Sequence, residues 1–188
     1  MCEQQPSHKY EAVALDSTIV LCMDASGSMA GEKVDMAREA LSEFVQEAQA
    51  PTNRIALVTF GGRVDVACKP TRDVERILRS IDGMGAGGKT PFAGALREAW
   101  SLVEDDATQS AIVIASDGLP TDEPTDSILA LGRLIAATGT RIVTVAIGAD
   151  ADREFLRALA SCSRDAFHTK PSDLVLTYKT IASGLVPK

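Results

Sequence analysis

Five side chains with oxygen donors stand at places in the chain where they suit metal chemistry. The stretch Asp24-Ala-Ser-Gly-Ser28 carries a carboxylate and two hydroxyls, and Thr90 and Asp117 add a third hydroxyl and a second carboxylate. Such oxygens suit a hard divalent cation such as Mg²⁺, which often keeps water where protein ligands are few. Two carboxylates balance the charge of the ion. If neutral hydroxyls fill the inner positions, a carboxylate of another molecule can take the position that stays open.

A glycine-rich loop before Thr90 suggests a different chemistry, nucleotide hydrolysis. The sequence GMGAGGKT, from Gly83 to Thr90, matches the phosphate-binding loop pattern of Gly, four residues and Gly-Lys-Thr. The run AIVIASD, which ends at Asp117, is similar to the strand and acidic residue that hold magnesium in such enzymes. A phosphate loop needs a strand before it and a helix after it, so that backbone N–H groups converge on phosphate.

The residues before the glycine loop have the pattern of a helix instead of a strand. Apolar residues from Val74 to Ile81 recur at spacings of three, one and three, which is one face of a helix. A nucleotide hydrolase would also leave the Asp24 to Ser28 motif without a role. We therefore keep a P-loop-type nucleotide hydrolase only as the alternative function. In the main interpretation the glycines form a turn between two helices, and Lys89 is a solvated loop residue.

The rest of the chain alternates between apolar strands and amphipathic helices. Strands are predicted at 17–23, 54–60, 63–69, 111–116, 141–148 and 166–169, and helices at 34–48, 74–81, 91–103, 127–138, 153–162 and 173–186. Strands that are apolar almost throughout indicate a parallel sheet buried on both faces. The two runs around Gly61-Gly62 predict a hairpin, which adds one antiparallel edge strand. We expect a doubly wound α/β domain over residues 15–186, with helices on both faces, after an N-terminal extension, 1–14.

The predicted fold brings the oxygen donors to one place. In doubly wound sheets, ligands bind beyond the carboxyl ends of the strands, where the strand order reverses. Asp24 ends the first strand and Asp117 follows the fourth, while the glycine loop presents Thr90 at the start of a helix. We therefore expect all of these side chains at the same edge of the sheet.

Composition and charge limit the classes of partner. With 188 residues, 45% of them hydrophobic, the chain suits one domain with a full core. Its net charge of -7 argues against nucleic acid, which is bound by clustered Lys and Arg. The N-terminus lacks a secretory signal pattern, and no apolar run approaches the length of about 20 residues that crosses a bilayer. The four cysteines are far apart in the sequence, and Cys22 and Cys68, which stand in apolar strand-like segments, are expected to be buried thiols. We expect a cytoplasmic monomer with no membrane partner.

The pattern Asp-x-Ser-x-Ser, followed by a distant Thr and a distant Asp, resembles the metal ion-dependent adhesion site of the von Willebrand factor type A domain family. All positions of that site are present as Asp24, Ser26, Ser28, Thr90 and Asp117, and the resemblance covers residues 15–186. It implies that Ser26 and Ser28 bind the metal directly and that Asp24 acts through water. It also implies that Thr90 is an inner ligand when a partner is bound, and that Asp117 alternates between direct and water-mediated contact.

The same resemblance implies a metal-dependent protein-binding module, a scaffold or adaptor, and not an enzyme. The ion, Mg²⁺ or in its place Mn²⁺, would capture an Asp or Glu side chain of a partner protein. No His stands near the motif, so no general base is left for catalysis. A phosphohydrolase of the haloacid dehalogenase type needs an Asp where this chain has Ser26. Short stand-alone bacterial members suggest AAA-type ATPases, or kinase and phosphatase systems, as partners.

Overall fold

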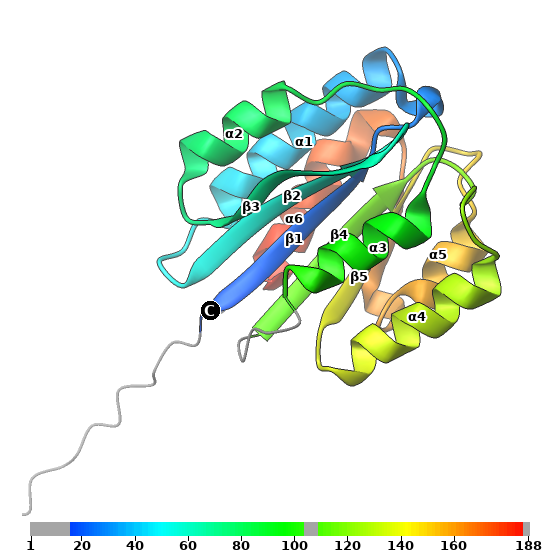
Figure 1. Ribbon diagram of the computed structural model, residues 1–188. Helices are drawn as coiled ribbons and strands as arrows, with labels where there is room; N and C mark the ends of the chain where they lie inside the picture. The colour runs from blue at the N-terminus through cyan, green and yellow to red at the C-terminus, as the bar shows by residue number, and fades with distance from the viewer. Residues whose placement is uncertain (1–15, 104–108, 186–188) are drawn as a thin grey trace, which may run out of the picture.

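A computed structural model describes residues 16–103 and 109–185, and the predicted N-terminal extension lies outside these ranges. Within them, six strands form one sheet (Figure 1). The strands are β1 Ser17–Asp24, β2 Asn53–Phe60, β3 Val64–Thr71, β4 Gln109–Ser116, β5 Arg141–Ile147 and β6 Ala166–Thr169. Each predicted strand is thus present, with ends that differ by a few residues.

Helices cover both faces of the sheet, as predicted. The α-helices are α1 Glu32–Glu47, α2 Val74–Asp82, α3 Phe92–Ser101, α4 Thr125–Ala137, α5 Arg153–Leu159 and α6 Leu174–Leu185, and the short 3-10 helices are η1 Gly27–Met29, η2 Ser163–Asp165 and η3 Pro171–Asp173. The helices α1, α2 and α6 pack on one face, and α3, α4 and α5 pack on the other (Figure 1). No described helix combines the length and the apolar character needed to cross a membrane.

The strand order β3-β2-β1-β4-β5-β6 places the point of reversal between β1 and β4. All neighbouring strands are parallel except β2 and β3, which confirms the predicted antiparallel edge strand. Met23 of β1 pairs with Ala115 of β4, so the residues that follow them, Asp24 and Ser116, lie at the same level. This is the position where doubly wound folds bind ligands.

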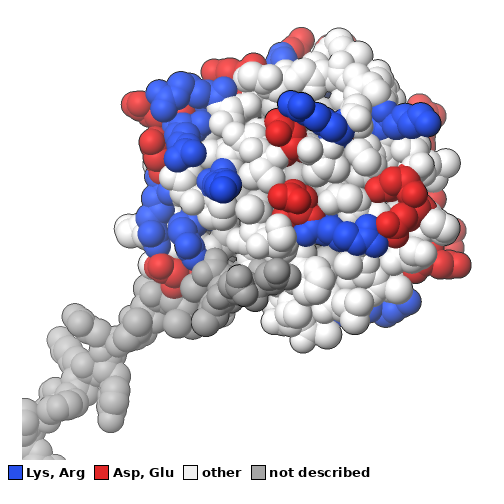
Figure 2. Space-filling view, in the orientation of Figure 1, with Lys and Arg blue, Asp and Glu red and all other residues white. Residues whose placement is uncertain are grey.

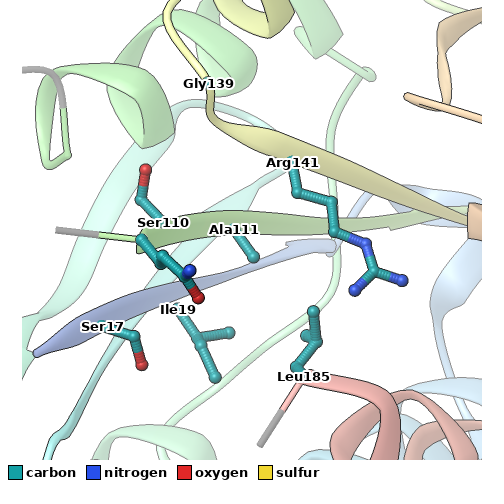
Figure 3. Close-up of a pocket in the computed structure, with 8 residues that line it drawn as sticks. Ser17, Ile19, Ser110, Ala111, Gly139, Arg141 and Leu185 are labelled. Atoms are coloured by element: carbon teal, nitrogen blue, oxygen red, sulfur yellow. The ribbon is translucent and has the colours of Figure 1, made fainter. Parts of the chain in front are cut away.

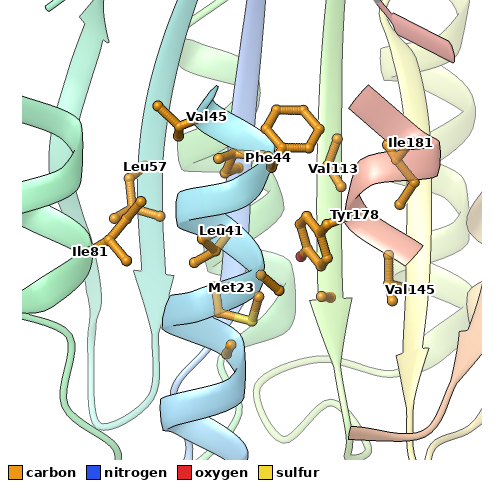
Figure 4. Close-up of a cluster of buried hydrophobic side chains, with 14 of the residues drawn as sticks. Met23, Leu41, Phe44, Val45, Leu57, Ile81, Val113, Val145, Tyr178 and Ile181 are labelled. Carbon is orange, nitrogen blue, oxygen red and sulfur yellow. The ribbon is translucent and has the colours of Figure 1, made fainter. Parts of the chain in front are cut away.

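Burial on both faces explains why the parallel strands lack polar alternation. All residues of β1 are buried, with Met23 in the core beneath α1 and α6 and Cys22 in the core beneath α3 and α4. Figure 4 shows the first of these cores, in which the rings of Phe44 and Tyr178 pack edge to face with centroids 5.9 Å apart. The thiols of Cys22 and Cys68 are buried and free, as predicted.

Most helix ends differ from the predictions by one to three residues. Pro91 precedes α3 as its N-cap and is not its first residue. The helix predicted over 153–162 ends at Leu159, and the backbone of Ala160 after it is extended. Ser161 instead bonds the start of β5, donating from its N–H to Ile142 O at 2.9 Å and accepting from Ile142 N at 2.8 Å.

Charged side chains are interspersed on the face of the molecule shown in Figure 2. Lys and Arg gather mainly at its left edge, with acidic side chains among them. Across the rest of this face, separate basic and acidic side chains are surrounded by uncharged surface. On this face, therefore, the basic residues do not form the continuous stripe that is typical of nucleic-acid binding.

Candidate metal site

The Asp24 carboxylate stabilises the loop that follows β1 through hydrogen bonds. Asp24 is fully buried. Its Oδ1 accepts a hydrogen bond from Ser26 N at 2.8 Å, and its Oδ2 accepts one from Ser116 Oγ. The 3-10 helix η1 begins directly after this turn. The turn therefore holds the hydroxyl oxygens of Ser26 and Ser28 together, 3.0 Å apart.

Burial raises the pKa of Asp24 above its ordinary value of 3.8. Hydrogen bonds from Ser116 and Ser26 act in the opposite direction, and the nearby charge of Asp117 raises the pKa further. Desolvation and a like charge both disfavour the ionised carboxylate. A cation between the two carboxylates would relieve both effects, so the donor set fits a divalent metal ion.

Asp117, directly after β4, has a side chain that is only 1% exposed. Its Oδ1 accepts a hydrogen bond from Ser28 Oγ at 2.6 Å, and its Oδ2 forms an ion pair with Lys33 Nζ. Lys33 lies in the first turn of α1, where the helix dipole disfavours a cation. The ion pair with Asp117 offsets that cost, and it links α1 to the end of β4.

Thr90 is held by two hydrogen bonds with Thr121, one to its side chain and one from its backbone. Thr90 N donates to Thr121 Oγ1 at 3.0 Å, and Thr121 N donates to Thr90 O at 3.0 Å. A Cβ placed on Gly118 would lie 3.8 Å from Thr90 Oγ1 and 3.9 Å from Ser28 Oγ. The two hydroxyls therefore approach one point above Gly118, and this residue has no side chain to separate them.

The glycine loop supports the loop after β1. Gly27 N donates to Gly88 O at 3.0 Å, and Gly87 N donates to Ala25 O at 2.7 Å. Gly88 has a positive φ of 81°, which favours glycine. The chain enters this loop from α2 and leaves it into α3, so the strand that a phosphate loop requires does not precede it. Lys89 is exposed, as predicted.

The structure thus brings the predicted oxygen donors of β1, the glycine loop and β4 to one edge of the sheet. Three residues that the sequence analysis did not assign also hold the site, namely Ser116, Thr121 and Lys33. The sequence contained one indication that Ser116 belongs to the site, namely its position at the end of a strand beside Asp117. In the described ranges, no group of three or more His, Cys, Asp or Glu side chains could hold a metal, so a metal bound at this position would need the hydroxyls as further ligands.

A separate cavity of about 280 Å³ lies at the opposite edge of the sheet (Figure 3). Ser17 and Arg141, the first residues of β1 and β5, line it together with Leu185 of α6. The Arg141 guanidinium is already engaged, because it pairs with Asp165 at 2.5 Å and donates to the carbonyl of Gly184. This cavity contains none of the predicted metal ligands.

The model of the von Willebrand factor type A domain family matches residues 19–119. The chain belongs to this family. The matched span contains the Asp24 to Ser28 motif, Thr90 and Asp117.

Sequence relatives of this von Willebrand factor type A domain include subunits of magnesium chelatase. The 67 kDa subunit of Heliobacterium mobile is 31% identical over 144 residues, which cover 68% of this chain and 22% of that protein. The 67 kDa subunit of Chlorobaculum tepidum is 32% identical over 104 residues, which cover 53% of this chain and 17% of that protein. The chain therefore spans about a fifth of the length of these relatives.

Solved structures of the same fold include a pili tip protein and a matrix protein of the mussel byssus. The von Willebrand factor domain of a type V pili tip protein from Porphyromonas gingivalis has a TM-score of 0.79 and 14% identity, with 93% of this chain and 96% of that one covered. Proximal thread matrix protein 1 from the mussel byssus was solved with a zinc-occupied MIDAS motif, the abbreviation for a metal ion-dependent adhesion site. It has a TM-score of 0.75 and 18% identity, with 90% of this chain and 46% of that one covered. At such identities the likeness shows the fold.

Proposed function

We propose that this domain is a metal-dependent protein-binding module, a scaffold or adaptor that captures an acidic side chain of a partner protein and catalyses no reaction. The observation that carries the proposal is the cluster of two buried carboxylates and three hydroxyls at the switch point of the sheet. Its members are Asp24, Ser26, Ser28, Thr90 and Asp117.

The chemistry of this cluster favours a hard divalent cation, Mg²⁺ or Mn²⁺. Asp24 is buried with a raised pKa, and a bound cation would stabilise its ionised form. The zinc in the MIDAS motif of the mussel protein supports a divalent metal without deciding which. When bound, the ion supplies a Lewis-acidic position at which a carboxylate oxygen of the partner can bind.

The residues of the site suit binding better than catalysis. Asp24 and Asp117 are engaged by Ser26, Ser28, Ser116 and Lys33. Neither carboxylate is left to move protons as a general base. The relatives are named as subunits of a larger enzyme, which supports a protein partner for this domain. We propose an AAA-type ATPase, or a kinase or phosphatase system, as that partner.

A calorimetric titration with Mn²⁺ tests the metal site. The proteins are the wild type, Asp24→Ala and the control Asp126→Ala, which removes an exposed acid in the first turn of α4. We expect the wild type and the control to bind Mn²⁺ without ATP, and Asp24→Ala to lose about tenfold or more in affinity. Circular dichroism would confirm that each variant is folded. Binding that requires ATP and survives Asp24→Ala would support the nucleotide hydrolase alternative instead.

A further inference from the structure

An open groove of about 440 Å³ adjoins the proposed metal site. One wall is the turn between β2 and β3, with Gly61, Gly62 and Arg63, and the other is the glycine loop at 85–87. Ala25 also lines the groove, and it lies between the proposed ligands Asp24 and Ser26. The groove therefore begins at the loop that would hold the metal.

Backbone hydrogen bonds fix this groove relative to the loop after β1, which carries the proposed ligands Ser26 and Ser28. Gly87 N donates to Ala25 O at 2.7 Å, Gly62 N donates to Gly87 O at 2.8 Å, and Ala25 N donates to Phe60 O at 2.7 Å. These bonds join the β1 loop, the glycine loop and the β2–β3 turn. A chain that lies in the groove thus has a defined position relative to the metal.

The glycines around the groove are of two kinds. A Cβ on Gly61 would lie 2.5 Å from Ala25 O, and one on Gly88 would lie 2.3 Å from Gly62 Cα, so the packing of the backbone requires glycine at both positions. Gly85 and Gly87 differ, because neither has a positive φ and an added Cβ at either meets no atom within 4 Å. The fold does not require glycine there. The absence of side chains at Gly85 and Gly87 leaves the groove open on this side.

The charge at the turn indicates what the groove would receive. Arg63 is exposed, lines the groove, and has no ion pair within the described part of the chain. Asp65, two residues further along β3, lines the groove as well. An acidic side chain would complement Arg63, and a neutral or basic one would suit the position of Asp65.

We propose that this glycine groove is an interaction surface for an extended segment of the partner protein that carries two acidic side chains. The segment presents one carboxylate to the metal, lays its backbone over Gly85 and Gly87, and presents a second acidic side chain to Arg63. Side chains on one face of an extended chain recur at every second residue, about 6.6 Å apart. The two acids are therefore expected at an even spacing. The inference rests on the proposed function and deepens it.

A phage-displayed library of short peptides with a fixed central Glu provides the probe. Peptides are selected on the wild-type protein in Mn²⁺ and eluted with EDTA. We expect a second Asp or Glu at an even spacing, and after selection on Arg63→Glu we expect Lys or Arg at that position. Gly87→Leu should weaken the selected peptides by about tenfold or more while its affinity for Mn²⁺ stays that of the wild type. The control is Gly184→Leu on α6, where an added Cβ also meets no atom within 4 Å.

The outcomes separate this inference from the function on which it rests. Metal-dependent peptides that bind Gly87→Leu and Arg63→Glu as they bind the wild type would overturn the groove and leave the metal-dependent module in place. If no peptide binds in a metal-dependent manner, the proposed function fails and the groove fails with it. If Gly87→Leu loses Mn²⁺ affinity, Gly85→Leu and Arg63→Glu decide, because Gly87 N donates to Ala25 O in the loop after β1, whereas neither Gly85 nor Arg63 makes a backbone hydrogen bond to that loop within the described residues.

Discussion

Lys33 Nζ lies 2.5 Å from Asp117 Oδ2, so a lysine in the first turn of α1 holds the carboxylate that follows β4. The other oxygen of Asp117 is bound by Ser28 Oγ. The Lys33 side chain is 32% exposed, whereas that of Asp117 is almost fully buried. The pair places a positive charge beside the oxygen cluster that we propose as the metal site. If a divalent cation binds there as proposed, Lys33 competes with it for Asp117.

Removal of this competitor should tighten metal binding. For Lys33→Met we expect an affinity for Mn²⁺ about three to ten times that of the wild type, because a nearby positive charge and an ion pair that must be broken are both lost. Lys33→Arg should restore wild-type affinity. Lys89→Met is the control, since Lys89 is exposed in the neighbouring loop. Weaker binding by Lys33→Met, or an equal gain in both Met variants, would contradict the competition.

Asp24 predicts a dependence of stability on metal and pH. The pKa of its carboxyl is raised in the folded state, mainly by burial. The folded protein therefore holds this proton more tightly than the unfolded chain does, and without metal its stability falls as pH rises from the ordinary value of 3.8 through the raised pKa. Asp24→Asn should increase the free energy of unfolding in EDTA at neutral pH by about 1 kcal/mol.

In Mg²⁺, the wild type is expected to be more stable than Asp24→Asn, the reverse of their order in EDTA. Mg²⁺ should raise the melting temperature of the wild type at neutral pH, with an effect that fades as pH falls and Asp24 takes up its proton, and it should leave Asp24→Asn unchanged. Thermal unfolding in Mg²⁺ and in EDTA measures both effects. An equal response of both proteins to Mg²⁺ would mean that Asp24 does not contribute to the site.

The ion pair between Arg141 and Asp165 predicts a loss of stability in acid. Burial raises the pKa of Asp165, but hydrogen bonds from Arg141 and Cys162 and the charge of Arg141 more than offset this, so the pKa is lowered. The stabilisation is therefore present above the ordinary value of 3.8 and is lost as pH falls through the lowered pKa. Because Arg141 is half exposed to water, Arg141→Met should cost about 1–2 kcal/mol at neutral pH.

Urea unfolding over a range of pH checks this expectation. The control is Arg72→Met, which removes an ion pair with Asp16 that is exposed on both sides and should cost about 0.5 kcal/mol or less. The difference between Arg141→Met and the wild type should shrink as pH falls through the lowered pKa of Asp165. A difference that is the same at every pH would show that Arg141 acts through packing alone.

Substitution by alanine is expected to change the stability of the fold differently at Gly61 and at Gly85. Gly61→Ala forces a methyl group against Ala25 O, which should destabilise the fold by about 1–3 kcal/mol and weaken Mn²⁺ binding through the displaced β1 loop. Gly85→Ala meets open space, so it should be neutral or stabilise the fold by up to about 1 kcal/mol. Urea unfolding with Mn²⁺ titration measures both. Equal destabilisation by the two variants would contradict the distinction.

Local patterns in the sequence were sufficient for the order and type of the elements. The stripe from Val74 to Ile81 showed that a helix enters the glycine loop, and the uniformly apolar strands showed a sheet covered on both faces. Helix ends were less accurate. α5 ended early because Ser161 bonds Ile142 of the neighbouring strand, a contact between distant residues that leaves no periodic trace.

By itself, the sequence determined the family motif and the set of oxygen donors, because residue type and spacing along a strand and its following loop are local properties. Only the tertiary structure decided how these donors are held. Lys33 reaches Asp117 across 84 positions, and Ser116 reaches Asp24 across 92. The groove beside the loop that follows β1 likewise exists only where three loops meet at the end of the sheet. Contacts of this kind depend on the strand order, which no single stretch of the chain contains.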